Sequence, residues 1–78
     1  MPKVTVYSTP ICPYCIKAKQ FLKQNNIKFE EIDVSLNHDK AMEMVKKSGQ
    51  SGVPVIDIDG KIVIGYDVPR LKSLLGIK

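Results

Sequence analysis

Asp59-Gly60 fixes more of the architecture than any other pair of residues in this sequence. The pair separates two short runs rich in β-branched residues, Val55–Ile58 and Lys61–Ile64. Asp-Gly favours a two-residue turn whose backbone twist matches that of paired strands, so the segment predicts a β-hairpin. The chain therefore contains at least one antiparallel pair of strands, and the preceding residues must be arranged around it.

The first half of the chain predicts a strand, a helix and a second strand. Apolar and β-branched residues over Lys3–Ser8 indicate a buried strand, and apolar residues at helical spacing indicate a helix from Pro13 to Gln24. A second strand is predicted over Phe29–Val34. A strand–helix–strand unit implies two parallel strands joined by a right-handed crossover.

Two more helices complete the predicted order β-α-β-α-β-β-α. The first ends at Gly49, and the second begins at Pro69 and ends at Gly76. Their apolar sides consist of Ala41, Met42, Met44 and Val45 in the first helix and of Leu71, Leu74 and Leu75 in the second. The sequence thus predicts one α/β domain over residues 1–78, with a mixed four-stranded sheet flanked by helices.

Composition excludes several functional classes. The net charge is +4 with a pI near 9.2, but the lysines are spread along the whole chain, and the longest basic run is Lys46-Lys47. Neither a basic stripe interleaved with aromatics nor a glycine-rich phosphate loop is present, which argues against a nucleic-acid partner. No apolar targeting segment and no run long enough for a membrane span occur, so we expect a cytoplasmic protein that does not contact membranes.

The two cysteines form a Cys12-Pro13-Tyr14-Cys15 motif at the junction of the first predicted strand and helix. Two cysteines at this spacing are too few for a structural disulfide framework and indicate redox or metal chemistry. The free N–H groups at a helix start favour the thiolate, which is the nucleophile in disulfide exchange. Cys15 lies one turn further on and is expected to be less exposed. Cys12 is therefore the predicted attacking thiol and Cys15 the predicted resolving thiol.

Two other interpretations of the cysteine pair remain open at this stage. The thiols could simply be packed, or they could hold zinc or an iron–sulfur cluster. A zinc site needs four ligands, and the only other soft ligand is His38, far along the chain, so a metal would have to bridge two chains. The leading prediction is a monomer with no metal and no bound cofactor. Tyr14 is expected either to line the substrate surface or to pack.

Three motifs in order make the sequence resemble the glutaredoxin family over nearly its whole length. The first is the cysteine motif at Cys12–Cys15. The second is Gly52-Val53-Pro54, which resembles the family's Thr-Val-Pro segment, and the third is Gly65-Tyr66-Asp67, which resembles the end of its Gly-Gly-x-Asp segment. The resemblance implies a thioredoxin fold and a disulfide oxidoreductase that acts on disulfide-bearing proteins, with glutathione as co-substrate.

The resemblance also implies roles for residues outside the cysteine motif. Pro54 would follow a cis peptide bond and lie beside Cys12, and the Val53 backbone would pair with substrate backbone as an added strand. Asp67 would face the amino group of the γ-glutamyl part of glutathione, and it is also a predicted N-cap. The residues implied to bind substrate or glutathione are Tyr14, Gly52, Val53, Pro54, Tyr66 and Asp67.

Several positions differ from the family pattern. Many members that use glutathione carry a Lys shortly before the first cysteine, whereas this chain has Ser8-Thr9-Pro10-Ile11. Gly52 replaces the Thr of Thr-Val-Pro, and Ile64 replaces the first Gly of Gly-Gly. These features and the short length resemble the glutaredoxin-like electron donors of ribonucleotide reductase, which thioredoxin reductase recharges. That donor role is the alternative function.

Overall fold

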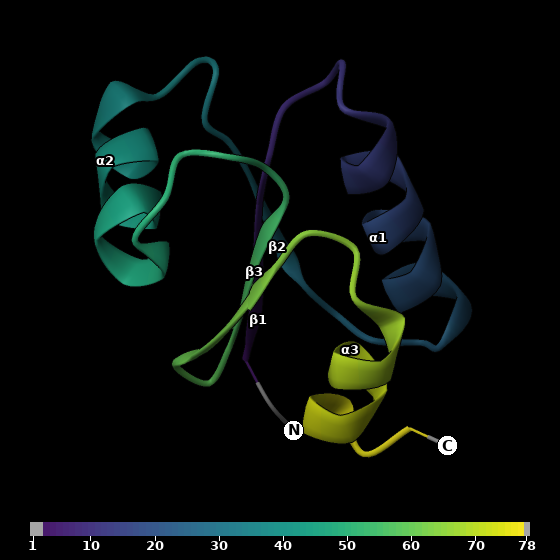
Figure 1. The fold of residues 1–78 in the computed structure, drawn as a ribbon. Coiled ribbons are helices and arrows are strands. Elements are labelled where there is room, and N and C mark those ends of the chain that lie inside the picture. The colour runs from purple at the N-terminus through teal and green to yellow at the C-terminus, as the bar shows by residue number, and fades with distance from the viewer. Residues whose placement is uncertain (1–2, 78) are drawn as a thin grey trace.

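A mixed four-stranded sheet with the order β2-β1-β3-β4 forms the centre of the computed structural model, which describes residues 3–77 (Figure 1). β1 pairs in parallel with β2 and antiparallel with β3, which pairs antiparallel with β4. The strands are β1 (Val4–Ser8), β2 (Glu30–Asp33), β3 (Val55–Ile58) and β4 (Lys61–Ile64), and the helices are α1 (Pro13–Gln24), α2 (His38–Ser48) and α3 (Val68–Leu75). The predicted order and sheet are confirmed. Met1, Pro2 and Lys78 lie outside the described residues.

The helices cover both faces of the sheet, with α1 and α3 on one face and α2 on the other (Figure 1). Side chains of a strand alternate between the two faces, so β1 contributes Val4 and Val6 to one layer and Tyr7 to the other. The larger cluster, between the sheet and α1 and α3, contains the fully buried Leu22 and Leu71. β1, which has a neighbouring strand on each side, is buried along its whole length. The buried strand therefore fixes the position at which the following loop begins.

The hairpin predicted from Asp59-Gly60 is present. Both turn residues have positive φ, 51° at Asp59 and 90° at Gly60, as a two-residue hairpin turn requires. The Asp57 carboxylate accepts a hydrogen bond of 2.7 Å from the Gly60 N–H and stabilises the turn. The register that follows pairs Ile58 with Lys61.

The apolar side predicted for α2 is partly wrong. Met44 is buried, but 50% of Met42 and 41% of Val45 remain exposed. Only one side chain of this helix enters the smaller cluster, because α2 covers a narrow part of the sheet around Tyr7 and Val55. The predicted end at Gly49 is confirmed, since Gly49 adopts the left-handed C-cap conformation.

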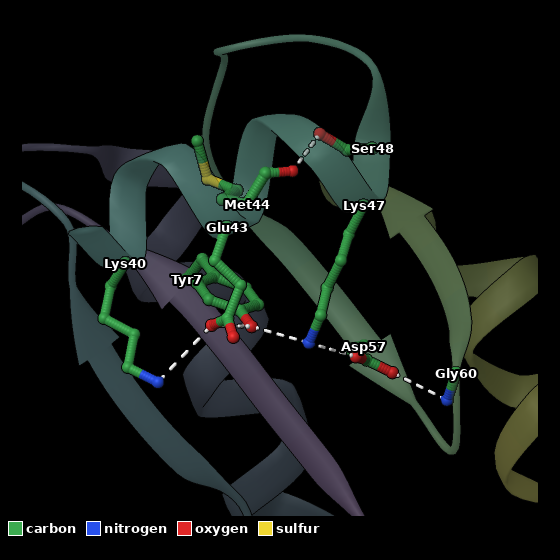
Figure 2. Close-up of polar contacts among 8 residues, drawn as sticks. All are labelled: Tyr7, Lys40, Glu43, Met44, Lys47, Ser48, Asp57 and Gly60. Atoms are coloured by element: carbon green, nitrogen blue, oxygen red, sulfur yellow. Dashed lines mark hydrogen bonds and ion pairs between the residues drawn. The ribbon is translucent and has the colours of Figure 1, made fainter. Parts of the chain in front are cut away.

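Polar contacts attach α2 to the sheet where apolar contacts are few (Figure 2). The Tyr7 hydroxyl donates a 3.0 Å hydrogen bond to Glu43 and accepts one of 2.9 Å from the Lys47 ammonium group. Lys47 also forms an ion pair of 2.9 Å with Asp57 on β3. Burial raises the pKa of Tyr7, while hydrogen bonding to Lys47 opposes that shift. These contacts tie two strands to one helix.

The three helices are short, and within residues 3–77 no helix has the length and apolar character needed to cross a membrane.

Candidate active site

The loop that carries Cys12 begins directly after β1. Thr9 and Cys12 close a tight turn, in which the Cys12 N–H donates to the Thr9 carbonyl at 3.4 Å and Pro10 and Ile11 occupy the corner positions. Pro at the first corner position presets the required φ. α1 then begins with Pro13, whose missing N–H is no loss at a helix start. The local sequence therefore dictates both the turn and the start of the helix.

Cys12 is the N-cap of α1, and its sulfur occupies the position of a capping side-chain oxygen. The Cys15 N–H donates to the Cys12 Sγ at 3.2 Å. This N–H is one of the four that a helix start leaves without an intrahelical partner, and it points at the sulfur together with the positive end of the helix dipole. The first turn of α1 contains no acidic residue that would oppose negative charge. An N–H donor and the positive end of the helix dipole therefore both face the Cys12 sulfur.

The same sulfur also contacts the backbone of Val53. As a thiol, Cys12 donates a long hydrogen bond of 3.8 Å to the Val53 oxygen. The Val53–Pro54 peptide bond is cis, as the family resemblance implies. Once Cys12 loses its proton it no longer donates to this carbonyl, which is then free to accept a hydrogen bond from another backbone N–H. The site thus places a nucleophilic sulfur and a free peptide group side by side.

Cys15 has a very different environment from Cys12. Its side chain is fully buried, whereas Cys12 is half-buried, and both cysteines are free thiols in this structure. Burial, and after it the interaction with the Cys12 side chain, raises the pKa of the Cys15 thiol from 9.0 to about 11, although the Thr9 backbone and the Lys19 charge oppose the shift. Cys15 is therefore a protonated, shielded thiol at neutral pH, as a resolving group should be until it is needed.

The third motif lies next to the second. The Gly65 N–H donates to the Pro54 carbonyl at 2.8 Å, so the turn before α3 is held against the Val53–Pro54 segment. Asp67 is exposed and caps α3, its Oδ1 accepting from the Arg70 N–H at 3.3 Å. The predicted N-cap is thus confirmed. The second carboxylate oxygen has no hydrogen-bond partner within residues 3–77 and is open to a ligand.

Tyr14 and Tyr66 differ in their surroundings. Tyr14 is 59% exposed beside Cys12, with the Lys17 ammonium group 5.3 Å from its ring centre, so the ring lies on the surface and not in the core. Tyr66 is half-buried and packs edge-on against Phe21, with 6.5 Å between ring centres. The structure gives Tyr66 a packing role, and its part in substrate binding stays a prediction.

Within the described part of the chain, no three residues of the types His, Cys, Asp and Glu gather closely enough to hold a metal ion. His38 is the exposed first residue of α2, and Asn37 caps that helix.

A dithiol at the junction of a strand and a helix, beside a cis-proline segment, defines the class of thiol–disulfide oxidoreductases with a thioredoxin fold. The sequence model of the glutaredoxin family matches residues 4–63. The chain is 43% identical over 72 residues to an uncharacterised glutaredoxin-like 8.6 kDa protein in the rubredoxin operon of Clostridium pasteurianum; the match covers 92% of this chain and 96% of that protein. The chain therefore belongs to the glutaredoxin family.

Two solved structures have the same fold. A mutant of the thioredoxin-like protein BC3987 superposes with a TM-score of 0.92 at 36% identity, over the full length of both chains. The buckwheat glutaredoxin–glutathione complex superposes with a TM-score of 0.76 at 26% identity, covering 96% of this chain and 71% of that one. The expected thioredoxin fold is confirmed.

Proposed function

We propose that this protein is a dithiol glutaredoxin that reduces protein disulfides or glutathione mixed disulfides through Cys12 and Cys15. One observation carries the proposal. The Cys12 sulfur accepts the Cys15 N–H at 3.2 Å, is half-buried rather than enclosed, and lies 3.8 Å from a backbone carbonyl. This combination activates the sulfur, leaves it accessible and provides a backbone group beside it that can hold a peptide.

The reaction proceeds in two exchanges. The Cys12 thiolate attacks a sulfur of the substrate disulfide, a Cys12–substrate disulfide forms, and the other substrate sulfur leaves as a thiolate. Cys15 then loses its proton and attacks the Cys12 sulfur, which forms the Cys12–Cys15 disulfide and releases the reduced substrate. The departing thiolate or solvent accepts the Cys15 proton during the second exchange. The contribution of Cys12 to the raised pKa of Cys15 is lost once Cys12 is in the mixed disulfide, which makes that proton easier to remove.

Two molecules of glutathione can complete the cycle. The first attacks the Cys12–Cys15 disulfide, the second attacks the resulting mixed disulfide, and glutathione disulfide leaves while both cysteines return to thiols. The Val53 backbone and the open Asp67 oxygen are the groups that we assign to glutathione, with Tyr14, Gly52, Pro54 and Tyr66 around them. Family membership and the glutathione complex of the buckwheat relative support this assignment.

A specific observation favours a second candidate, a glutaredoxin-like donor to ribonucleotide reductase recharged by thioredoxin reductase. The loop Ser8–Ile11 offers no cation for a glutathione carboxylate. In addition, both backbone groups of Gly52 already bond to the Gln50 side chain. Both features weaken a glutathione site without affecting the two cysteines.

One experiment separates the two reductants. Fully oxidised protein is mixed either with glutathione at millimolar concentration or with NADPH and a thioredoxin reductase, and the return of free thiols is followed in time. We expect reduction by glutathione. The Cys12→Ser variant cannot form this disulfide, and in a separate assay it should reduce no substrate disulfide. Reduction by the reductase alone would establish the second candidate, and retained disulfide reduction in Cys12→Ser would contradict both.

We further propose that the protein acts as a monomer in the cytoplasm. A reducing compartment returns the dithiol to its active form between turnovers.

A further inference from the structure

The side chain of Gln50 forms two hydrogen bonds with a single residue of the substrate-facing segment. Its Oε1 accepts from the Gly52 N–H at 2.6 Å, and its Nε2 donates to the Gly52 carbonyl at 3.0 Å. A carboxamide has the same donor and acceptor as a peptide group. Gln50 therefore pairs with Gly52 as one residue of a neighbouring strand would.

This pairing fixes which way the next residue faces. When the N–H and carbonyl of one residue point to the same side, the backbone there is extended, and the groups of the following residue point to the opposite side. Accordingly, Gln50 lies on one side of Gly52, and the Val53 carbonyl faces the Cys12 sulfur. Gln50 is half-buried and directly follows Gly49, the C-cap of α2.

The absence of a side chain at position 52 makes room for this contact. A Cβ on Gly52 would lie 2.7 Å from the Gln50 Oε1, closer than carbon and oxygen atoms approach. Any other residue would thus displace the carboxamide. Gly52 and Gln50 form a matched pair, which accounts for the difference from the family's Thr at position 52.

We propose that Gln50 is a positioning residue, whose carboxamide holds Gly52 extended so that the Val53 backbone meets the backbone of a peptide disulfide while Cys12 attacks its sulfur. This inference rests on the proposed function, since it assigns a part of the same substrate site. The Gln50 carboxamide bonds to Gly52 and not to either cysteine sulfur. It should therefore affect substrates that have a peptide backbone and spare those that do not.

The test uses two probes with the same leaving group, 5-thio-2-nitrobenzoate. One is its mixed disulfide with a blocked Ala-Cys-Ala peptide, and the other is its mixed disulfide with 2-mercaptoethanol. Cys12 attacks the sulfur of the peptide or the mercaptoethanol, the sulfur–sulfur bond breaks, and the coloured thiolate leaves. Stopped-flow absorbance then gives a second-order rate constant for each probe with wild-type, Cys12→Ser and Gln50→Ala proteins.

We expect Gln50→Ala to slow the peptide probe about five- to tenfold, roughly the effect of one peptide hydrogen bond, and to change the mercaptoethanol rate less than about twofold. Gln50→Glu keeps the acceptor for the Gly52 N–H, so its rate with the peptide probe should lie between the rates of the wild-type and Gln50→Ala proteins. Equal rates for wild-type and Gln50→Ala proteins, or equal losses with both probes, would overturn the positioning role. A wild-type protein no faster than Cys12→Ser would instead overturn the proposed function.

A double-mutant cycle distinguishes positioning from a general loosening of the loop. Gly52→Ala should slow the peptide probe about as much as Gln50→Ala does, because it displaces the same carboxamide. When Gln50 is already Ala, adding Gly52→Ala should have almost no further effect. Two independent losses that multiply in the double variant would contradict the coupling of this pair.

Discussion

At the scale of single residues, Cys12 and Cys15 have the same side chain but different positions in the fold. This difference in position is the basis of the two roles that we propose for them. Cys12 is at the cap position, where it accepts an N–H and has access to solvent. Cys15, one turn into α1, points into the protein and is fully buried. Burial penalises a charged sulfur and raises the pKa of Cys15 to about 11. One turn of helix thus separates the thiol that we propose attacks from the thiol that we propose resolves.

The raised pKa of Cys15 predicts how the stability of the reduced protein depends on pH. In the unfolded chain this thiol ionises near its ordinary pKa of 9.0, while in the folded protein it holds its proton up to about pH 11. Between these values the unfolded state binds fewer protons, so the free energy of unfolding falls as pH rises. We expect a loss of about 2 to 3 kcal/mol over this range that Cys15→Ser does not show.

Denaturant titrations of the reduced wild-type and Cys15→Ser proteins at pH 8, 9, 10 and 11, with excess reductant, measure this effect. Other groups that titrate in the range, such as Tyr7, are common to both proteins and cancel in the difference. Parallel stability curves for the two proteins would contradict the assigned burial of Cys15.

At the residue scale, the sequence predicted the reactive groups of the site but not their supports. The spacing of Cys12 and Cys15 was sufficient to predict which thiol attacks and which resolves, because a helix start has the same polar groups in every protein. That assignment stays a prediction. The contacts of Gln50 were not predictable, since its partner Gly52 is two residues away in a loop without a repeating pattern. Likewise, the packing of Tyr66 on Phe21 depends on how α3 meets α1, which no local pattern determines.

At the scale of elements, α2 and α3 each bury one side chain, but Leu74 and Leu75 of α3 also pack against the larger cluster, whereas no second side chain of α2 packs against the smaller one. Met44 is the only buried residue of α2. The predicted Met42 and Val45 are on the edge of its apolar side and remain largely exposed. Helical periodicity predicted a broad apolar side for α2. How many of those side chains are buried depends on how closely the helix approaches the sheet. The predicted strand over Phe29–Val34 was longer than β2. Phe29 packs against the larger cluster, and Val34 lies just beyond the strand, where its N–H still donates to the Ser8 carbonyl at 3.0 Å.

A matched pair of variants in α2 tests this description. Met44→Ala should destabilise the protein by about 2 to 4 kcal/mol, because it removes a fully enclosed side chain and leaves a cavity. Val45→Ala, one residue further along the same helix, should cost less than about 1 kcal/mol and serves as the control. Thermal or urea unfolding of both variants gives the comparison, and similar losses in the two would contradict the orientation of α2.

At the scale of the whole molecule, one sheet with helices on both faces brings three segments that are distant in the sequence to the same end of the strands. The loop after β1 supplies Cys12, the segment before β3 supplies Val53, and the turn before α3 supplies Asp67. The strand order β2-β1-β3-β4 produces this meeting, and before the structure only the family resemblance implied that Pro54 would lie beside Cys12. The element order had been derived from periodicity, turn residues and caps, all of which agree in this chain.

Cys12, Cys15 and the Val53 carbonyl meet within one chain, and we predict a monomer without metal. Protein of 8.7 kDa purified anaerobically should sediment as a single chain and contain no stoichiometric zinc or iron. The Cys12→Ser protein is the control, because it cannot form a bridge through both cysteines. About half an equivalent of metal per chain, together with a dimer that dissociates in chelator, would establish the bridged alternative.

Trapping the first covalent intermediate tests the division of labour between the two cysteines most directly. Cys15→Ser can attack a peptide disulfide but cannot resolve the product, so the peptide should remain attached to Cys12 as a stable mixed disulfide. Proteolysis without reductant followed by mass spectrometry locates it. We predict one peptide per chain, on Cys12, and none on the Cys12→Ser protein. A peptide attached through Cys15 in Cys12→Ser at a comparable rate, or no adduct with Cys15→Ser, would contradict the assignment of Cys12 as the attacking thiol.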